Sequence, residues 1–327
     1  MKYHNRYFGD IYLHDTTIKY PHVDDQHMVI YPKYHDYVYD KDFPYRLKDK
    51  WNRFLSFWVH LILIVIGVPA IKLMYGLKIK GKENIKKYFK LNGNRKAMIS
   101  TCNHTVATDF IMVSATRHKV PTMPMWQEGA ESKQGMLFRR AVGLVVPKKD
   151  NLKGIAYSYK EMKEVLNENK WLHIYPEAAS WPLYPCLRDF RRGTFTLAYD
   201  FDLPILPMGV KFREPKGLYR LFKKSACASL TIGEPILANK SLERSESIDD
   251  FKVRTFNATL HLLGIKDQEE NQRIRQEIYN INNEINQIED NNNEINNNND
   301  INNNINNNDI NNIHEYQTTI IKKPKTD

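Results

Sequence analysis

The 327-residue sequence contains few cysteines and does not begin with an apolar segment. Its three cysteines, Cys102, Cys186 and Cys227, lie far apart in the chain, which argues against a disulfide framework and predicts a reducing compartment. Residues 1–50 are polar and rich in Tyr, His and Asp, so we expect no secretory signal there. Neither the cysteines nor the His and acidic residues show zinc or calcium spacing. The sequence therefore predicts no metal and no cofactor.

The charge of the chain is unevenly distributed around its formal net value of +10. Residues 1–50 carry 8 basic and 8 acidic side chains, and residues 267–327 carry 5 basic and 12 acidic ones. The remaining 35 basic and 18 acidic residues leave the middle of the chain with a net charge of +17. So basic a segment favours phosphate-bearing ligands or an anionic membrane as partners. Nucleic acid is a poorer candidate, because the basic residues are scattered and form no recognised nucleic-acid-binding module.

The most apolar part of the chain is Phe54–Ile71, 18 residues without a formal charge. This length is the lower limit for crossing a bilayer. Gly67 and Pro69 are expected to bend or end the helix. We therefore predict an N-terminal membrane-anchoring helix, or a helix pair that enters one leaflet and returns. A buried core helix is the alternative.

Short apolar segments alternate with helical ones between Gly81 and Gly264, which predicts an α/β domain whose mostly parallel sheet is flanked by helices. The expected strands are Ala97–Cys102, Thr122–Trp126, Gly143–Pro147, Leu172–Tyr175, Ile205–Phe212 and Ala228–Ile232. The expected helices are Asp109–Arg117, Lys133–Arg140, Ile155–Asn167, Thr194–Phe201 and Asp249–Leu263.

These patterns divide the chain into four parts. They are an irregular polar arm (1–50), to which no function can be assigned, an apolar anchor (51–80), the α/β domain (81–265) and an Asn-rich tail (266–327). We expect the tail to be disordered, with at most a transient helix. Its isoleucines also allow a weak coiled-coil oligomer, because five of them follow a heptad spacing. These are Ile274, Ile278, Ile281, Ile285 and Ile288.

The stretch around His104 and Asp109 places an imidazole and a carboxylate five positions apart, the His-X4-Asp (HX4D) spacing. Within one regular helix the two side chains would point about 140° apart and could not meet. They can meet if His104 follows a strand and Asp109 lies one turn into the next helix. Asp109 would then bind one ring nitrogen and leave the other free to accept a proton. The alternative is a strand-end histidine bonded to a backbone carbonyl.

Three further stretches carry candidate binding residues. Glu177 follows a strand and a proline, where its carboxylate could bind substrate hydroxyls or steady cations; an ordinary capping or surface glutamate is the alternative. Arg188, Arg191, Arg192 and Gly193 precede a helix, where guanidinium groups and free amides suit a phosphate. A basic solvated turn is the alternative there. Lys148 and Lys149 are adjacent cations at the end of an expected strand.

Together and in this order, the motifs resemble the glycerolipid acyltransferase family, whose members acylate lysophosphatidic acid. Its first block is matched in full by Asn103, His104, Asp109 and Phe110. Its third block is matched at Tyr175-Pro176-Glu177 but departs at Ala178, and no arginine follows directly. The second block is matched at Gly143, with Lys148 and Lys149 where an acid and an arginine are usual. The Arg191-Arg192-Gly193 run and the Pro204–Pro207 block also match. We interpret the departures as a changed head group.

The resemblance implies a membrane-bound O-acyltransferase that moves a fatty acyl chain from acyl-CoA to the free hydroxyl of a lysophospholipid such as 1-acyl-glycerol-3-phosphate. His104 and Asp109 would form the catalytic pair. Asn103, Glu177, Lys148, Lys149, Arg188, Arg191, Arg192 and Gly193 would bind substrate. Acyl-CoA serves as co-substrate, and membrane lipids are partners. We expect the endoplasmic reticulum or another intracellular membrane, with the domain facing a reducing compartment.

Two other functions fit the same sequence. One is a CoA-independent transacylase that moves chains between phospholipids and lysophospholipids. The other is a non-catalytic membrane protein whose basic cleft binds anionic lipid, which the altered second and third blocks would explain. These hypotheses differ in the donor they require and in whether any acyl transfer occurs.

Overall fold

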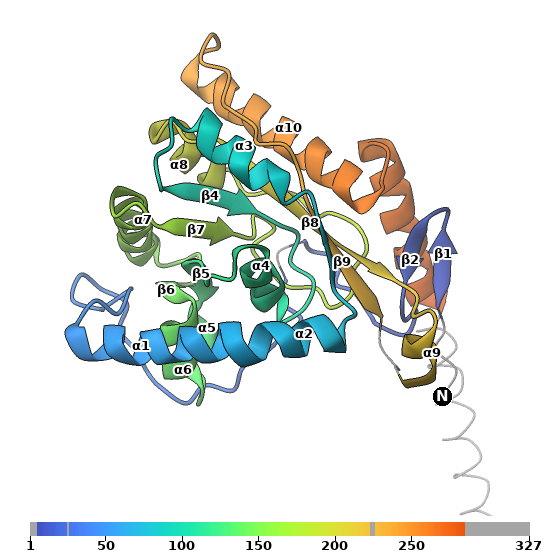
Figure 1. Cartoon of the computed structure of the whole chain (residues 1–327), viewed down its shortest axis with the longest axis horizontal. Helices are drawn as coiled ribbons and strands as arrows, with labels where there is room; N and C mark the ends of the chain where they lie inside the picture. The colour runs from blue at the N-terminus through green and yellow to red at the C-terminus, as the bar shows by residue number, and fades with distance from the viewer. Residues whose placement is uncertain (1–4, 25, 223–225, 285–327) are drawn as a thin grey trace, which may run out of the picture. The chain divides into compact units, whose positions relative to one another are not determined.

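A computed structural model describes residues 5–24, 26–222 and 226–284 of the chain. By residue contacts the chain divides into two units, Met1–Gln276 and Glu277–Asp327. The first unit holds the whole α/β fold, together with the N-terminal arm and the apolar helix (Figure 1). The predicted arm, anchor and domain therefore belong to one compact body.

A five-stranded sheet with the order β3-β9-β8-β4-β7 forms the centre of this unit. Its strands are β3 (Lys78–Lys80), β4 (Met98–Thr101), β7 (Trp171–Ile174), β8 (Ile205–Arg213) and β9 (Cys227–Ile232). A smaller parallel pair, β5 (Met123–Trp126) and β6 (Gly143–Val146), continues beyond β7. An isolated parallel bridge between Thr122 and Leu172 links it to the sheet.

The sheet is mixed, whereas the sequence predicts a mostly parallel one. Strand β4 runs parallel to β7 and β8, and β3 runs parallel to β9. The longest pair, β8 with β9, is antiparallel from Met208↔Ile232 to Arg213↔Cys227. A parallel connection needs a helix that crosses one face of the sheet. Between β8 and β9 the described residues hold only the five-residue helix α9 (Leu218–Phe222), so β9 turns back beside β8.

Seven helices of the described residues pack around the strands. They are α3 (Glu83–Leu91), α4 (Asp109–Arg117), α5 (Gln127–Glu131), α6 (Gly135–Ala141), α7 (Leu152–Asn167), α8 (Gly193–Asp200) and α10 (Arg244–Leu263). Five of them lie near the positions that the apolar pattern predicts, whereas the pattern does not predict α3 and α5. Helix α10 lies directly over β8, where a Cβ on Gly209 would come within 2.9 Å of Leu262. Gly209 therefore permits this close approach of helix and strand.

The apolar segment is helical throughout, from Lys50 to Met74. It comprises α1 (Lys50–Ile62), a π-helical turn η1 (Leu63–Gly67) and α2 (Val68–Met74). The π-turn absorbs the irregularity at the glycine and proline, so neither residue ends the helix. Among the described residues this is the one helix long and apolar enough to cross a membrane, and only 11% of its most apolar window is buried.

The N-terminal arm is irregular after a short hairpin, β1 (Arg6–Phe8) with β2 (Ile11–Leu13). It nevertheless lies firmly on the domain. Arg46 bonds Glu161 and Glu168 of the α7 region, and the guanidinium of Arg139 in α6 donates to the Pro44 carbonyl. The arm is thus an integral part of the first unit.

The beginning of the Asn-rich tail differs from the expected disorder, because residues 268–284 are helical. Asn271 is buried and bonds both backbone groups of Leu187: its side-chain oxygen accepts from the Leu187 N–H and its amide donates to the Leu187 carbonyl, each at 3.0 Å. The domain therefore continues past residue 265. Ile285 and Ile288 lie outside the described residues, so the heptad pattern stays a prediction.

Candidate active site

The loop between β4 and α4 brings His104 and Asp109 together as the spacing predicts. The Nδ1 atom of His104 lies 2.7 Å from Oδ2 of Asp109. Asp109 is the first residue of α4 rather than one turn into it, and it is 1% exposed. Its Oδ2 also accepts the Thr105 N–H at 3.1 Å, which fixes the carboxylate against its own loop. The His104 side chain remains 25% exposed.

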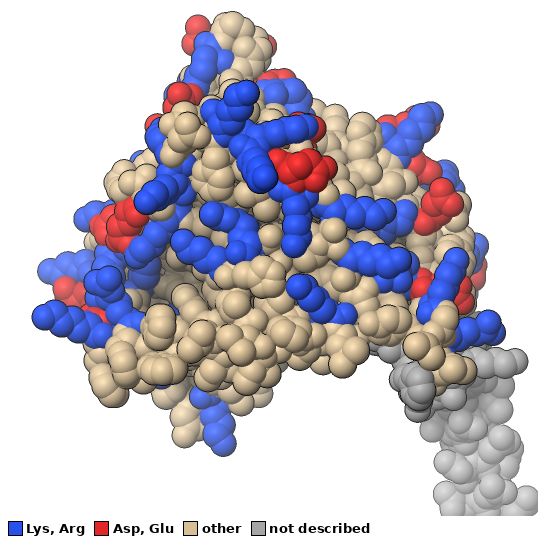
Figure 2. Space-filling view, in the orientation of Figure 1, with Lys and Arg blue, Asp and Glu red and all other residues tan. Residues whose placement is uncertain are grey.

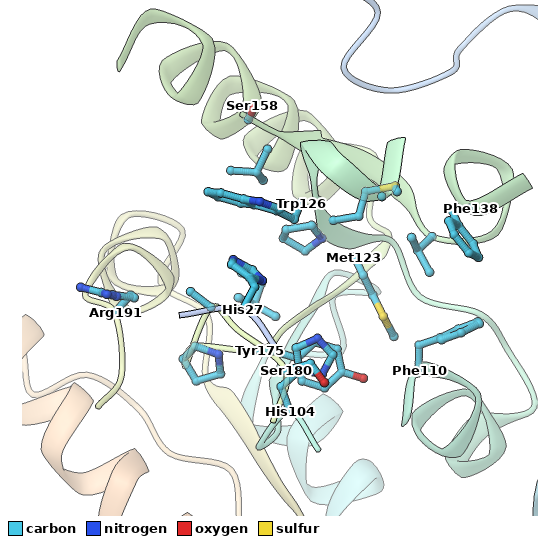
Figure 3. Close-up of a pocket in the computed structure, with 18 of the residues that line it drawn as sticks. His27, His104, Phe110, Met123, Trp126, Phe138, Ser158, Tyr175, Ser180 and Arg191 are labelled. Carbon is cyan, nitrogen blue, oxygen red and sulfur yellow. The ribbon is translucent and has the colours of Figure 1, made fainter. Parts of the chain in front are cut away.

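The His104 ring is held on its face as well as at its edge. The Tyr175 ring, just past the end of β7, stacks on it with centroids 4.1 Å apart and planes 12° from parallel (Figure 3). Burial, and then the negative charge of Asp109, raises the pKa of the Tyr175 hydroxyl well above its ordinary value. The hydroxyl therefore stays protonated and neutral beside the pair.

Glu177 and Arg188 form a buried ion pair behind this loop. Glu177 Oε2 accepts the His104 backbone N–H and the Arg188 Nη2, each at 2.9 Å, while Oε1 accepts the Arg188 backbone N–H. Their side chains are 2% and 1% exposed. Both side chains are thus enclosed by protein, where they position the His104 backbone, and their predicted contact with substrate stays a prediction.

Asn103 is also enclosed rather than available to substrate. Its side chain exchanges two hydrogen bonds with the backbone of Val210, accepting from the N–H at 2.8 Å and donating to the carbonyl at 3.0 Å. It is 1% exposed. Asn103 thus joins the end of β4 to β8 and supports the loop, and its predicted substrate contact stays a prediction.

A cavity of about 610 Å³ opens beside His104 and Asp109. Most of its lining is apolar or aromatic and comes from α4, β5, α6 and α7, including Phe110, Met123, Trp126 and Phe138 (Figure 3). Such a cavity suits an apolar ligand held by a few polar groups. Some of the polar groups lie near the imidazole: in Figure 3, Tyr175, Ser180 and His104 lie close together.

Three of the predicted cationic and glycine residues reach this cavity. Lys149, Arg191 and Gly193 line it, with Gly193 beginning α8. The Arg191 backbone N–H donates to the Pro176 carbonyl at 2.8 Å, which ties the arginine loop to the Glu177 loop. The cavity therefore has a basic margin in addition to its apolar interior.

Two other predicted binding residues do not line this cavity, and their role in binding stays a prediction. Arg192 turns outward and pairs with Asp249 and Ser245 of α10. Lys148 is not among the residues that line the cavity, and its Nζ lies 3.5 Å from Glu128. The reason is local. In an irregular segment successive side chains point in different directions, so adjacent cations cannot all face one cavity.

Comparison with known protein families identifies the part of the chain that contains this site. Residues 76–211 match the family model described as Acyltransferase. This part of the chain is an acyltransferase domain. The match confirms the family that the sequence motifs suggest, and it spans strands β3 to β8, the His104 loop and the cavity margin. No curated protein matches the chain.

A solved structure similar to the chain is the 1-acyl-sn-glycerophosphate (LPA) acyltransferase PlsC from Thermotoga maritima. The two share 17% identity over 64% of this chain and 82% of the other, with a TM-score of 0.42.

Two residues that line the cavity, Ser180 and His27, are not among the predicted site residues, and Tyr175 is predicted only as part of a motif. Ser180 has a buried hydroxyl without a hydrogen-bond partner among the described residues. Ser180 lies three residues after Glu177 on the same loop, and this proximity to a predicted binding residue is a sequence signal that could have identified it. Tyr175 matched a motif, but its stacking on His104 depends on two separate loops meeting. His27 lies in the N-terminal arm, and no sequence pattern connects it to the site.

Proposed function

We propose that the protein is a membrane-bound O-acyltransferase that transfers a fatty acyl chain from acyl-CoA to the free hydroxyl of a lysophospholipid. The observation that carries the proposal is the 2.7 Å contact between His104 and Asp109 at the margin of an apolar cavity. The family match of the surrounding residues supports the reaction class.

The geometry suits general-base catalysis by His104. Because Nδ1 donates to the Asp109 carboxylate, the ring's remaining nitrogen, Nε2, is the proton acceptor. Nε2 would take the proton of the lysolipid hydroxyl, and that oxygen would attack the thioester carbonyl. When the oxyanion collapses, the C–S bond breaks and the imidazolium returns its proton to the CoA thiolate. The basic margin at Lys149 and Arg191 would stabilise the oxyanion and hold the anionic substrates.

The exposed face of the apolar helix supports a membrane setting. Its large exposed side chains are Trp51, Phe54, Phe57, Trp58, Leu61, Ile62, Val65, Ile66, Leu73 and Met74. In Figure 2 the corresponding lower band is almost free of charge, and basic side chains lie directly above it. An apolar band bordered by cations is the composition that binds an anionic membrane surface.

The same helix is held along its length by the domain. At its start Asn52 accepts from Arg140, and further on His60 Nε2 contacts the Ala141 carbonyl at 2.9 Å. Val68 and Ile71 are buried. Since Ala141 lines the cavity, the helix adjoins the helices that enclose the cavity. We therefore favour a helix lying in one leaflet over a helix that crosses the bilayer away from the domain.

The experiment that tests the proposal measures acyl transfer from several acyl-CoA donors to a panel of lysophospholipids in mixed micelles. His104→Ala should lower the turnover by about 10²–10⁴-fold, the usual contribution of a general base. His118→Asn is the matched control, because this exposed histidine caps α4 in a left-handed conformation that asparagine tolerates. An alanine variant that keeps most of the turnover would remove the mechanism.

The donor is tested in the same preparation. Transfer from phospholipid in the absence of CoA would identify a transacylase and replace the acyl-CoA proposal. Salt-sensitive liposome binding without transfer from any donor would instead identify a lipid-binding protein.

A further inference from the structure

The N-terminal arm, which lies outside the part of the chain matched by the family, contributes to the cavity. His27, Val29 and Tyr31 line it, while Ile30 between them is 79% exposed. After a bend at Met28, the alternation of Val29, Ile30 and Tyr31 is that of an extended segment laid across an opening with every second side chain pointing inward. The arm therefore forms part of the cavity wall.

The inward side chains contact apolar walls contributed by the domain. The His27 ring stacks on Trp126 with centroids 4.8 Å apart, and the Tyr31 ring meets Phe138 edge to face at 5.9 Å. Figure 3 shows His27 between Trp126 and the group of Tyr175, Ser180 and His104. The arm thus lies against both the apolar and the polar sides of the same space.

Hydrogen bonds on both sides fix this segment in place. Before it, the Asp24 carbonyl accepts from the buried Arg188 guanidinium at 2.7 Å, and Trp181 Nε1 donates to the Gln26 carbonyl at 2.9 Å. After it, the backbone N–H groups of residues 34 and 35 both donate to the Glu131 carbonyl. A wall held from both ends has a defined distance from the opposite wall.

We propose that segment 27–31 of the arm is a length-determining wall for the bound acyl chain, with Val29 and Tyr31 as its specificity residues. The proposal rests on the proposed function, because it assumes that the apolar cavity holds an acyl chain. Each buried methylene changes the binding constant by about fourfold. A substitution that shortens the cavity by the length of one or two methylene groups should therefore change the acyl-chain length that binds most tightly.

The test uses the full-length protein and S-alkyl-CoA thioethers of increasing chain length, which bind but cannot transfer their chain. Calorimetry of Val29→Phe, which fills the cavity, should show the optimum shortened by about two carbons and binding of the longest chains weakened about tenfold. Val29→Ala and Tyr31→Ala should shift the optimum toward longer chains. Ile30→Phe and Ile30→Ala are matched controls on the outward face and should leave the profile unchanged.

The outcomes separate this proposal from the proposed function. A wild-type protein that binds the thioethers with a length optimum but transfers no chain would refute the function and leave the wall proposal standing. An active enzyme whose Val29 and Tyr31 variants keep the wild-type length profile would refute the wall alone. Equal weakening at every chain length, or no thioether binding, would also refute it. Because Val29→Phe and Val29→Ala predict opposite shifts, failure of one variant to fold leaves the other as a test.

Discussion

Two histidines contact the same tyrosine in opposite ways. His104 lies on a loop, stacks parallel to the Tyr175 ring, pairs with a carboxylate and borders the cavity. His173 lies inside β7, meets the Tyr175 ring at 81° and is fully buried. Its Nδ1 lies 2.7 Å from the Ser100 hydroxyl. His104 is therefore a candidate base, because it has a carboxylate partner and borders the cavity. His173 is buried and contacts a hydroxyl instead.

The environment of His173 favours its neutral form. Trp171 Nε1 donates to Ser100 Oγ at 2.7 Å, and the same hydroxyl lies 2.7 Å from His173 Nδ1, so the ring is held by neutral hydrogen-bonding groups. Burial lowers the pKa of His173 to about 3. No carboxylate bonds this ring among the described residues, and the contrast with His104 can be tested by removing partners one at a time.

The largest expected effect is on His104, the proposed general base. Asp109→Asn keeps the size of the side chain but removes the charge that orients and stabilises the protonated ring. We expect turnover to fall by about 10²–10⁴-fold, as for loss of the base itself. Steady-state kinetics on micellar substrate measures the change, and the thermal midpoint is the control for folding. Turnover within a few-fold of wild type would show that the His104–Asp109 contact has only a structural role, as the contact between His173 and Ser100 does.

For His173 we expect the substitution to lower stability and to change turnover little. His173→Ala removes a fully buried ring and leaves the Ser100 hydroxyl without this hydrogen-bond partner. We expect a loss of about 3 kcal/mol in the free energy of unfolding, with turnover changed by only a few-fold. Urea denaturation measures the first quantity and kinetics at a stabilising temperature the second. A variant of normal stability but low turnover would reverse the roles assigned to the two histidines.

The low pKa of His173 also predicts acid sensitivity. Between its unfolded value of 6.5 and its folded value of about 3, the unfolded chain binds a proton that the folded chain does not. Stability from this group is complete above pH 6.5 and is lost as pH falls, by at most about 1.4 kcal/mol per pH unit. The slope of unfolding free energy against pH in this window should be smaller in His173→Ala than in wild type. Equal slopes would show that the folded ring is able to take up the proton.

The sequence predicts the β4–His104–α4 geometry well, because local strand and helix patterns fix where a loop begins and ends. It also locates most of the other elements of the domain. It cannot show that Asn103, Glu177 and Arg188 face inward, because each has a partner far away in the chain: Val210 for Asn103, His104 for Glu177 and Asp24 for Arg188. For the same reason the sequence cannot show that the N-terminal arm forms a wall of the cavity, since the other lining residues lie far from the arm in the chain. Side-chain direction in irregular segments depends on long-range contacts that local patterns do not encode.

The smallest predicted effect concerns the tyrosine shared by the two histidines. Tyr175→Phe keeps the ring that stacks on His104 and removes only the hydroxyl, so turnover should stay near wild type. Tyr175→Leu removes a stacking interaction worth about 0.5–1.5 kcal/mol, which corresponds to a turnover reduced by up to about tenfold. Steady-state kinetics measures the turnover of both variants, and the thermal midpoint of each is the control for folding. If phenylalanine lowers turnover as much as leucine does, the hydroxyl beside Asp109 is the important group and the stacking is incidental.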